Sequence, residues 1–284
     1  GRAAAIHLGR LGANVIASMR NYDGGNRTEA KELAKIAKDE DLNISMVEID
    51  VTDDAQVASG VAAAEEIAGG ALDVLINNAG IGMAGPVEIN DMAATRLIFE
   101  TNLFAYLRMA RAVLPKMRER GAGQIFNVSS QLGRILVPNI GMYCATNFGV
   151  EAMFETMAYE LAPFGVEVTI IQPGGYPTKI WESGARNAED LLARVDAERK
   201  AAYQGHLQIA SGIMSGGSST DPIDVPNAIA EIMAMPAGKR PLRRPVHPNT
   251  QATDTANNAM AQVQAGVLGS GTRGTMSRLL IERK

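Results

Sequence analysis

The sequence predicts a single α/β domain whose doubly wound parallel sheet is covered by helices on both faces. Short apolar segments alternate repeatedly with longer segments in which apolar residues recur at helical spacing. This alternation is typical of parallel strands joined by crossover helices. The 284 residues are enough for one large domain with a full hydrophobic core.

The predicted elements follow one another in a regular order. A Gly-Ala-Asn turn at residues 12–14 separates an opening amphipathic helix from the first strand, and later strands end at polar or Pro-Gly segments. We predict strands at residues 15–18, 44–49, 72–76, 124–128, 165–171 and 243–246. We predict helices at residues 1–8, 28–39, 54 onward, 89–118, 143–161, 188–203 and 221–235. The sequence after residue 249 is weakly helical and then rich in glycine and serine.

Composition narrows the possible partners and surroundings of the protein. The formal net charge is −4, which does not favour a nucleic-acid partner. No apolar run is long enough to predict a membrane span. The single cysteine, Cys144, excludes an intrachain disulfide and fits a reducing compartment, so we expect a cytoplasmic location. We predict no metal site.

The most informative stretch runs from residue 123 to residue 163. Its apolar strand ends in Ser129 and Ser130, and Tyr143 later opens an apolar series with helical spacing. A hydroxyl at a strand end and a phenol in the first turn of a helix can face one crevice, where open α/β sheets bind ligands. Each residue also has a simpler interpretation, because paired serines often form turns or caps and a lone tyrosine is often half-buried core.

Ser130 lies thirteen residues before Tyr143, and the sequence Asn77-Asn78-Ala79-Gly80 follows an apolar strand. Together these motifs resemble the short-chain dehydrogenase/reductase family, whose signature is Ser, about thirteen residues, and then Tyr-x-x-x-Lys. The resemblance implies that Ser130 holds a substrate carbonyl or hydroxyl and that Tyr143 is the general acid or base. The chain departs from the family at Asn147, where the family has the lysine.

The resemblance covers residues 1 to 246 and implies a Rossmann-like fold that binds NAD(P). The residues that would lie beside the cofactor are Gly1, Arg20, Asp50, Val51, Asn77, Ala79, Gly80, Tyr143, Asn147, Pro173, Gly174 and Thr178. By resemblance Asp50 contacts the adenine and Thr178 the nicotinamide carboxamide. A carboxylate before a helix is ordinarily a cap, so Asp50 keeps two interpretations.

Arg20 bears on the choice of cofactor. In the family's fold the end of the second strand meets the adenosine ribose, where an acidic residue would favour NAD. The strand at residues 15–18 corresponds to that second strand. Met19 and Arg20 stand there instead, and the planar guanidinium of an arginine matches a phosphate. NADP(H) is therefore favoured over NAD(H), although a solvated arginine at a strand end is also common.

Gly1 aligns with the last glycine of the family's Thr-Gly-x-x-x-Gly-x-Gly loop. We therefore expect the first strand and most of the glycine-rich loop to be absent from this sequence. The first strand lies at the centre of the sheet in such folds, so its two neighbours would lose a pairing partner. An incomplete sequence and a natural variant both explain the difference, and the first is favoured.

Three further expectations concern the surroundings of the site. Asn102 is either part of the catalytic shell, as the family's corresponding asparagine is, or a satisfied polar group of the core. Residues 179–217 correspond to the family's substrate lid, with Trp181, Ile213 and Met214 as possible lining. By resemblance, the helices at 89–118 and 143–161 would form a homodimer or homotetramer.

Two functions remain. The first is an NADP(H)-dependent oxidoreductase that interconverts a small-molecule carbonyl and its alcohol, with Ser130, Tyr143, Asn102 and Asn147 as catalytic residues. The second is a nucleotide-binding homologue with weak or no catalysis, which Asn147 and the missing loop favour. We assign residues 1–248 to the Rossmann-like domain. We assign residues 249–284 to an extension that is partly disordered or packs on a partner subunit.

Overall fold

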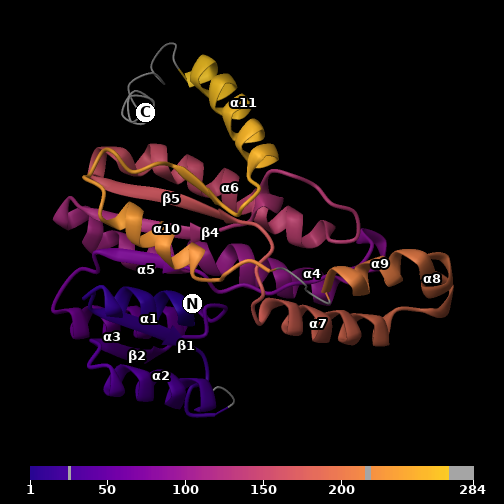
Figure 1. The fold of residues 1–284 in the computed structure, drawn as a ribbon, viewed down its shortest axis with the longest axis horizontal. Helices are drawn as coiled ribbons and strands as arrows, with labels where there is room; N and C mark the ends of the chain where they lie inside the picture. Colours follow the sequence, from indigo (N-terminus) through magenta and orange to yellow (C-terminus); the bar gives the residue numbers. More distant parts are fainter. Residues whose placement is uncertain (25–26, 215–218, 269–284) are drawn as a thin grey trace.

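The computed structural model describes residues 1–24, 27–214 and 219–268, and its elements alternate along the chain (Figure 1). The strands are β1 (Val15–Met19), β2 (Ile44–Glu48), β3 (Val74–Asn77), β4 (Gly123–Val128), β5 (Val166–Pro173) and β6 (Arg243–Val246). The longer helices are α1 (Arg2–Arg10), α2 (Arg27–Asp39), α3 (Asp54–Ala68), α4 (Met92–Phe99), α5 (Ala105–Arg120), α6 (Gly141–Leu161), α7 (Ile180–Arg194), α9 (Gln204–Met214), α10 (Asp224–Met233) and α11 (Gln251–Leu268). The short α8 spans Ala197–Ala202.

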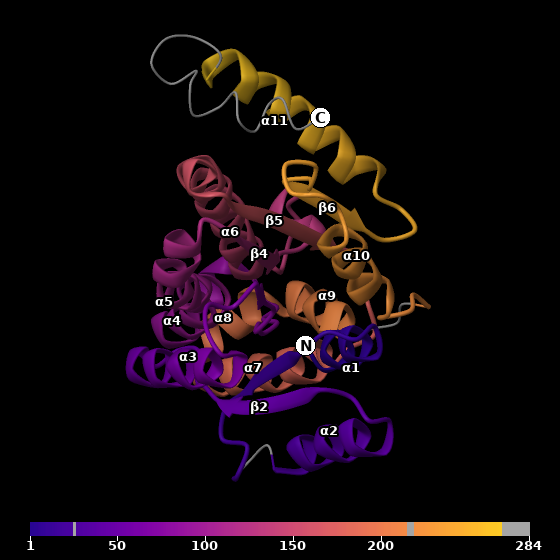
Figure 2. The ribbon, with the colours of Figure 1, turned by 90° about the vertical axis from the view of Figure 1, so that its left-hand side faces the viewer.

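All strand pairs of the described residues are parallel, and they form two sheets. β1 pairs with β2, and the second sheet has the order β3-β4-β5-β6. Figure 2 shows α3, α5 and α6 on one side of the sheets and α1 and α10 on the other. The predicted α/β fold with a doubly wound parallel sheet is confirmed. Among the described residues no strand pair joins the two sheets, so β1 and β3 are both edge strands.

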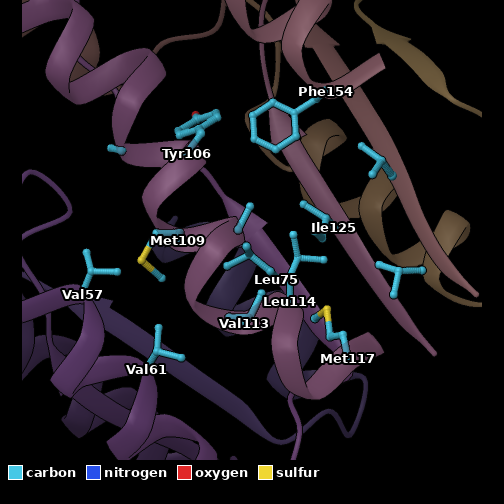
Figure 3. Packing of buried hydrophobic residues seen from close by; sticks show 14 of the residues in the cluster. Val57, Val61, Leu75, Tyr106, Met109, Val113, Leu114, Met117, Ile125 and Phe154 are labelled. Atoms are coloured by element: carbon cyan, nitrogen blue, oxygen red, sulfur yellow. The ribbon is translucent and has the colours of Figure 1, made fainter. Parts of the chain in front are cut away.

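Alternate residues of the strands fill two cores. Leu75 and Ile125 point to the face covered by α3, α5 and α6, where they pack with side chains such as Val61, Met117 and Phe154 (Figure 3). Phe126 lies one residue further along β4 and therefore points to the opposite face, against α1 and α10. The two cores explain why the apolar pattern of the central strands is continuous.

Two predicted helices are divided in the structure. The predicted helix at 89–118 consists of α4 and α5 joined by a π turn at Glu100–Phe104, which contains Asn102. The predicted polar helix at 188–203 consists of the end of α7 and the short α8, because the Asp196 side chain accepts the N–H of Arg199 and starts a new helix. Propensity and apolar spacing do not reveal a π turn, whereas the aspartate cap is visible in the sequence.

The segment predicted as a C-terminal extension begins with α11, which points away from the sheet in Figures 1 and 2. Asn257 joins this helix to the body of the protein, because its amide donates to Gln172 at 2.7 Å. The Gly/Ser-rich end from residue 269 lies outside the described residues. No helix among residues 1–24, 27–214 and 219–268 has the length and apolar character that a bilayer crossing requires.

Candidate active site

Ser130 lies two residues beyond the end of β4 and is buried. Its Oγ accepts the N–H of Leu132 at 3.1 Å and thereby caps the short helix Gln131–Gly133. The same hydroxyl lies 3.4 Å from the carbonyl oxygen of Pro173. Since β4 and β5 are neighbours, the structure brings Ser130 next to the Pro173–Thr178 segment. Ser130 therefore both caps a short helix and lies beside the loop that follows β5.

Tyr143 lies in the first turn of α6, as the sequence predicts. Burial raises the pKa of its phenol above the usual value of 10.0, and hydrogen bonding with Ser130 and Asn147 lowers it only in part. The predicted trio of Ser130, Tyr143 and Asn147 is thus brought together in space. At neutral pH the phenol holds its proton.

Asn147 lies one helical turn after Tyr143 and is buried. Its Nδ2 donates to the backbone carbonyl of Tyr143 at 2.9 Å, and the hydroxyl of Thr146 donates to the same oxygen at 2.9 Å. The amide is therefore held against its own helix beside the phenol. An amide carries no charge, so Asn147 does not stabilise a tyrosinate as a lysine cation would.

Asn102 connects two segments of the site. Its Oδ1 accepts the N–H of Ile81 at 2.8 Å, and its Nδ2 donates to the carbonyl of Ile81 at 3.0 Å. The same Nδ2 lies 3.5 Å from Oγ1 of Thr146 on α6. Asn102 thus fixes the loop after β3 against the helix of Tyr143, and π turns are frequent at functional sites.

The Asn-Asn-Ala-Gly segment begins at the last residue of β3. Asn77 is buried and donates to Oδ1 of Asn127 at 2.9 Å. The next side chain, Asn78, lies beside Gly1, because a Cβ atom at Gly1 would be 3.1 Å from its Nδ2. Ala79 and Gly80 follow with exposed or partly exposed backbone. The structure therefore places Gly1 against this segment.

Arg20 and Asp50 lie just beyond the ends of the neighbouring strands β1 and β2. Asp50 accepts hydrogen bonds from the backbone N–H and the hydroxyl of Thr52, at 2.9 and 2.7 Å. Burial raises the pKa of Asp50, but the Thr52 hydrogen bonds and the charge of Arg20 outweigh burial and leave the pKa below its usual value. The cap of α3 is Asp53, so Asp50 is not the cap.

The loop after β5 requires its glycine at Gly174, since a Cβ atom there would lie 2.5 Å from the His247 ring. The backbone N–H of Gly174 donates to Val246 at 3.0 Å. Further along, the Tyr176 hydroxyl donates to Asp224 at 3.1 Å, and Thr178 is exposed just before α7. The loop is fixed to β6 and α10 at its start and open at Thr178.

Four of the predicted residues, Asp50, Asn77, Ser130 and Pro173, lie at or just beyond the carboxyl ends of parallel strands, which is where ligands bind in open α/β sheets. Val51 is half-buried beside Asp50. The sequence profile of the short chain dehydrogenase family matches residues 1–189. The chain belongs to this family.

Other proteins show how far the likeness to this family extends. The uncharacterized oxidoreductase YusZ of Bacillus subtilis is 32% identical over 235 residues, which cover 82% of this chain and 80% of YusZ. A solved short-chain dehydrogenase of Streptomyces avermitilis is 30% identical, with a TM-score of 0.68 over 94% of this chain and 90% of the other. A gluconate 5-dehydrogenase of Burkholderia cenocepacia, solved with NADP and tartrate, is 28% identical, with a TM-score of 0.58 over 63% and 69%.

Sequence reasoning missed Glu151, a buried carboxylate on the helix of Tyr143 in this short-chain dehydrogenase. Its Oε1 accepts a hydrogen bond from Gln172 at 2.7 Å, and its Oε2 accepts one from Arg243 at 2.8 Å. Nη2 of Arg134 lies 3.3 Å from the same Oε2. The signal in the sequence was the spacing of Tyr143, Asn147 and Glu151, since residues four apart share a helix face.

The charges in this buried cluster balance. Arg243 also pairs with Glu155, so two arginines meet two glutamates. Burial lowers the pKa of Arg243, but the charges of Glu151 and Glu155 outweigh burial and raise it. The cations on this face of α6 are therefore compensated. They do not substitute for the positive charge that Asn147 lacks.

Glu151→Ala should destabilise the fold strongly, because it leaves two partly buried arginines with one carboxylate between them. We expect a loss of about 3–5 kcal/mol in the free energy of unfolding, measured by urea titration. Glu160→Ala, at an exposed position of the same helix, is the matched control and should change stability little. Equal stabilities of the two variants would show that the cluster does not hold α6 in place.

Proposed function

We propose that this short-chain dehydrogenase reduces a carbonyl compound to its alcohol with NADPH, and catalyses the reverse oxidation only slowly at neutral pH. The observation that carries the proposal is the convergence of Tyr143, Ser130 and Asn147 at the carboxyl end of the sheet, with a phenol that keeps its proton. Oxidoreductases of the same family among the relatives support it. The gluconate 5-dehydrogenase solved with NADP supports a nicotinamide cofactor.

The residues at the strand ends fit such a cofactor. Gly1 begins α1 without a side-chain cap, which leaves backbone N–H groups for phosphate oxygens. Asp50 and Arg20 offer a carboxylate and a guanidinium at the adenosine end, and the Gly174 backbone and Thr178 lie at the nicotinamide end. The bound nicotinamide supplies the hydride that the carbonyl carbon receives.

The chain's own residues handle the carbonyl oxygen. Ser130 donates a hydrogen bond to that oxygen and fixes its position. Tyr143 donates the phenol proton to the oxygen as negative charge develops there. Because burial keeps Tyr143 protonated, it is ready to act as an acid. To act as a base toward an alcohol it would first have to lose its proton, which its raised pKa disfavours at neutral pH.

The proposed residues that surround the reaction have supporting roles. Asn102 holds the Ile81 backbone and α6 together, and Asn147 keeps a hydrogen-bonding amide where the family has a cation. Exposed apolar side chains on α4 and α6, including Leu97 and Phe148, support assembly into a homodimer or homotetramer. A cytoplasmic location remains a prediction from the single cysteine.

The second candidate function is a nucleotide-binding homologue with little catalysis, and Asn147 is the observation that favours it. Oxidation of NADPH in the presence of a panel of ketones and aldehydes distinguishes the two. Steady turnover that is lost in Tyr143→Phe supports the oxidoreductase. Tight NADPH binding without turnover of any carbonyl supports the binding protein.

Arg20 should determine the preference for NADPH. If its guanidinium meets a 2′-phosphate, Arg20→Ala weakens NADPH binding by roughly ten- to a hundred-fold and leaves NADH binding nearly unchanged. Titration calorimetry with both cofactors measures this. Arg10→Ala, which removes an exposed guanidinium on α1 paired with Glu40, should affect neither cofactor. Equal losses for NADPH and NADH in the Arg20 variant would contradict the assignment.

Asn147→Lys should speed alcohol oxidation at neutral pH by at least about ten-fold. A cation about 4 Å from the phenolate at an effective dielectric of about 20 contributes roughly 4 kcal/mol, or about three pKa units. The raised pKa of Tyr143 means that the oxidation rate of the unsubstituted protein should increase as pH rises toward that pKa. The lysine should move the profile to lower pH.

The control for this substitution is Asn147→Gln, which lengthens the side chain without adding charge and should leave the pH profile in place. The measurement is kcat for alcohol oxidation across pH 6 to about 10. The account of the site is wrong if the lysine variant changes nothing while the unsubstituted protein already oxidises alcohols rapidly at pH 7.

A further inference from the structure

Tyr143 is partly buried and packs against two separate clusters of buried apolar residues. It is the residue shared by two separate clusters, one with Trp181, Ala185 and Ile213 and the other with Leu191 and Val195. These five residues belong to α7, α9 and the residue after α7, a segment called here the lid. Residues from the body of the protein belong to or pack against the same two clusters: Ile81, Met83, Ala84, Leu132, Ile140 and Met142.

The polar groups of the lid point elsewhere or are already paired. The charged side chains of α7 are exposed on its outer face: Glu182, Arg186, Glu189, Asp190 and Arg194. Asn187 donates to the carbonyl of Gly82 at 3.1 Å, and the indole N–H of Trp181 donates to the carbonyl of Tyr176 at 2.5 Å. The lid residues that share the two clusters with Tyr143 therefore present hydrocarbon and an anchored indole.

We propose that the substrate is an apolar ketone or its secondary alcohol, enclosed by the lid, and that Trp181 is a specificity-determining residue. This inference rests on the proposed function, because it takes Tyr143 to meet the reacting oxygen. A substrate that reaches Tyr143 meets the apolar lid side chains that share its two clusters. An apolar molecule covers that surface, whereas a charged one loses its hydration without gaining a partner.

Trp181 makes the inference testable without catalysis, because it is the chain's one tryptophan. We suggest titrating the protein with 2-decanol and with 9-hydroxydecanoate while recording tryptophan emission. The two probes share the chain length and the secondary hydroxyl, and differ in a terminal methyl against a carboxylate. We expect 2-decanol to saturate the emission change at a concentration at least about 100-fold lower than 9-hydroxydecanoate does, since burying a carboxylate without a partner is costly.

A pair of variants on α9 locates the response. Ile213 faces the Tyr143 cluster, whereas Ile209 on the same helix is 58% exposed. Ile213→Asp should raise the half-saturating concentration of 2-decanol at least about ten-fold, and Ile209→Asp should not change it. Far-UV circular dichroism checks that both variants are folded. If Ile213→Asp does not fold, the comparison of the two probes in the unsubstituted protein decides alone.

The outcomes separate this inference from the proposed function. Selective binding of 2-decanol without NADPH-dependent reduction of 2-decanone would refute the oxidoreductase and leave the apolar site standing. Reduction of charged or polyhydroxylated carbonyls in preference to 2-decanone would refute the apolar site and leave the oxidoreductase. Equal responses to both probes, or no change in tryptophan emission with either, would overturn the inference.

Discussion

The buried carboxylate of Glu151 is the constraint on which the geometry of the site depends. Through Arg134 it holds the segment that follows Ser130, and through Gln172 it holds the end of β5 next to Pro173. Through Arg243 it holds β6. A buried charge must keep its partners, because leaving one unpaired costs several kcal/mol. The helix that presents Tyr143 is thereby fixed against the loops that flank it on both sides.

On the same face of α6, asparagine at position 147 in place of the family's lysine changes the electrostatics of the site but not the position of the helix. The amide fits among buried neighbours and keeps a hydrogen bond to its own helix. Arg243 forms ion pairs with Glu151 and Glu155. The negative charges of these glutamates offset the effect of the arginine on the phenol. What is lost is therefore the electrostatic stabilisation of the tyrosinate and not the position of Tyr143. The direction of catalysis is more sensitive to this change than the fold is.

The sequence predicted the residues whose position follows from where a strand ends or a helix begins. Ser130, Tyr143 and Asn77 lie where their local pattern places them, because strand ends in a parallel sheet share one edge. Glu151 was missed because its role depends on partners from three distant segments. The proximity of Arg20 and Asp50 and the π turn at Asn102 also depend on tertiary contacts. The sequence predicted one polar helix at residues 188–203, whereas three helices, α7, α8 and α9, form in this region.

Tyr143 lies where the polar groups of the site meet apolar packing, and this position raises the pKa of its phenol. Its hydroxyl meets Ser130 and Asn147, while its side chain packs against two apolar clusters that contain residues of the lid and of the loop after β3. Burial is the leading cause of its raised pKa. A phenol at its usual pKa of about 10 is already protonated at neutral pH, so burial does not create the acid that carbonyl reduction requires. Burial instead makes the tyrosinate that alcohol oxidation requires still rarer.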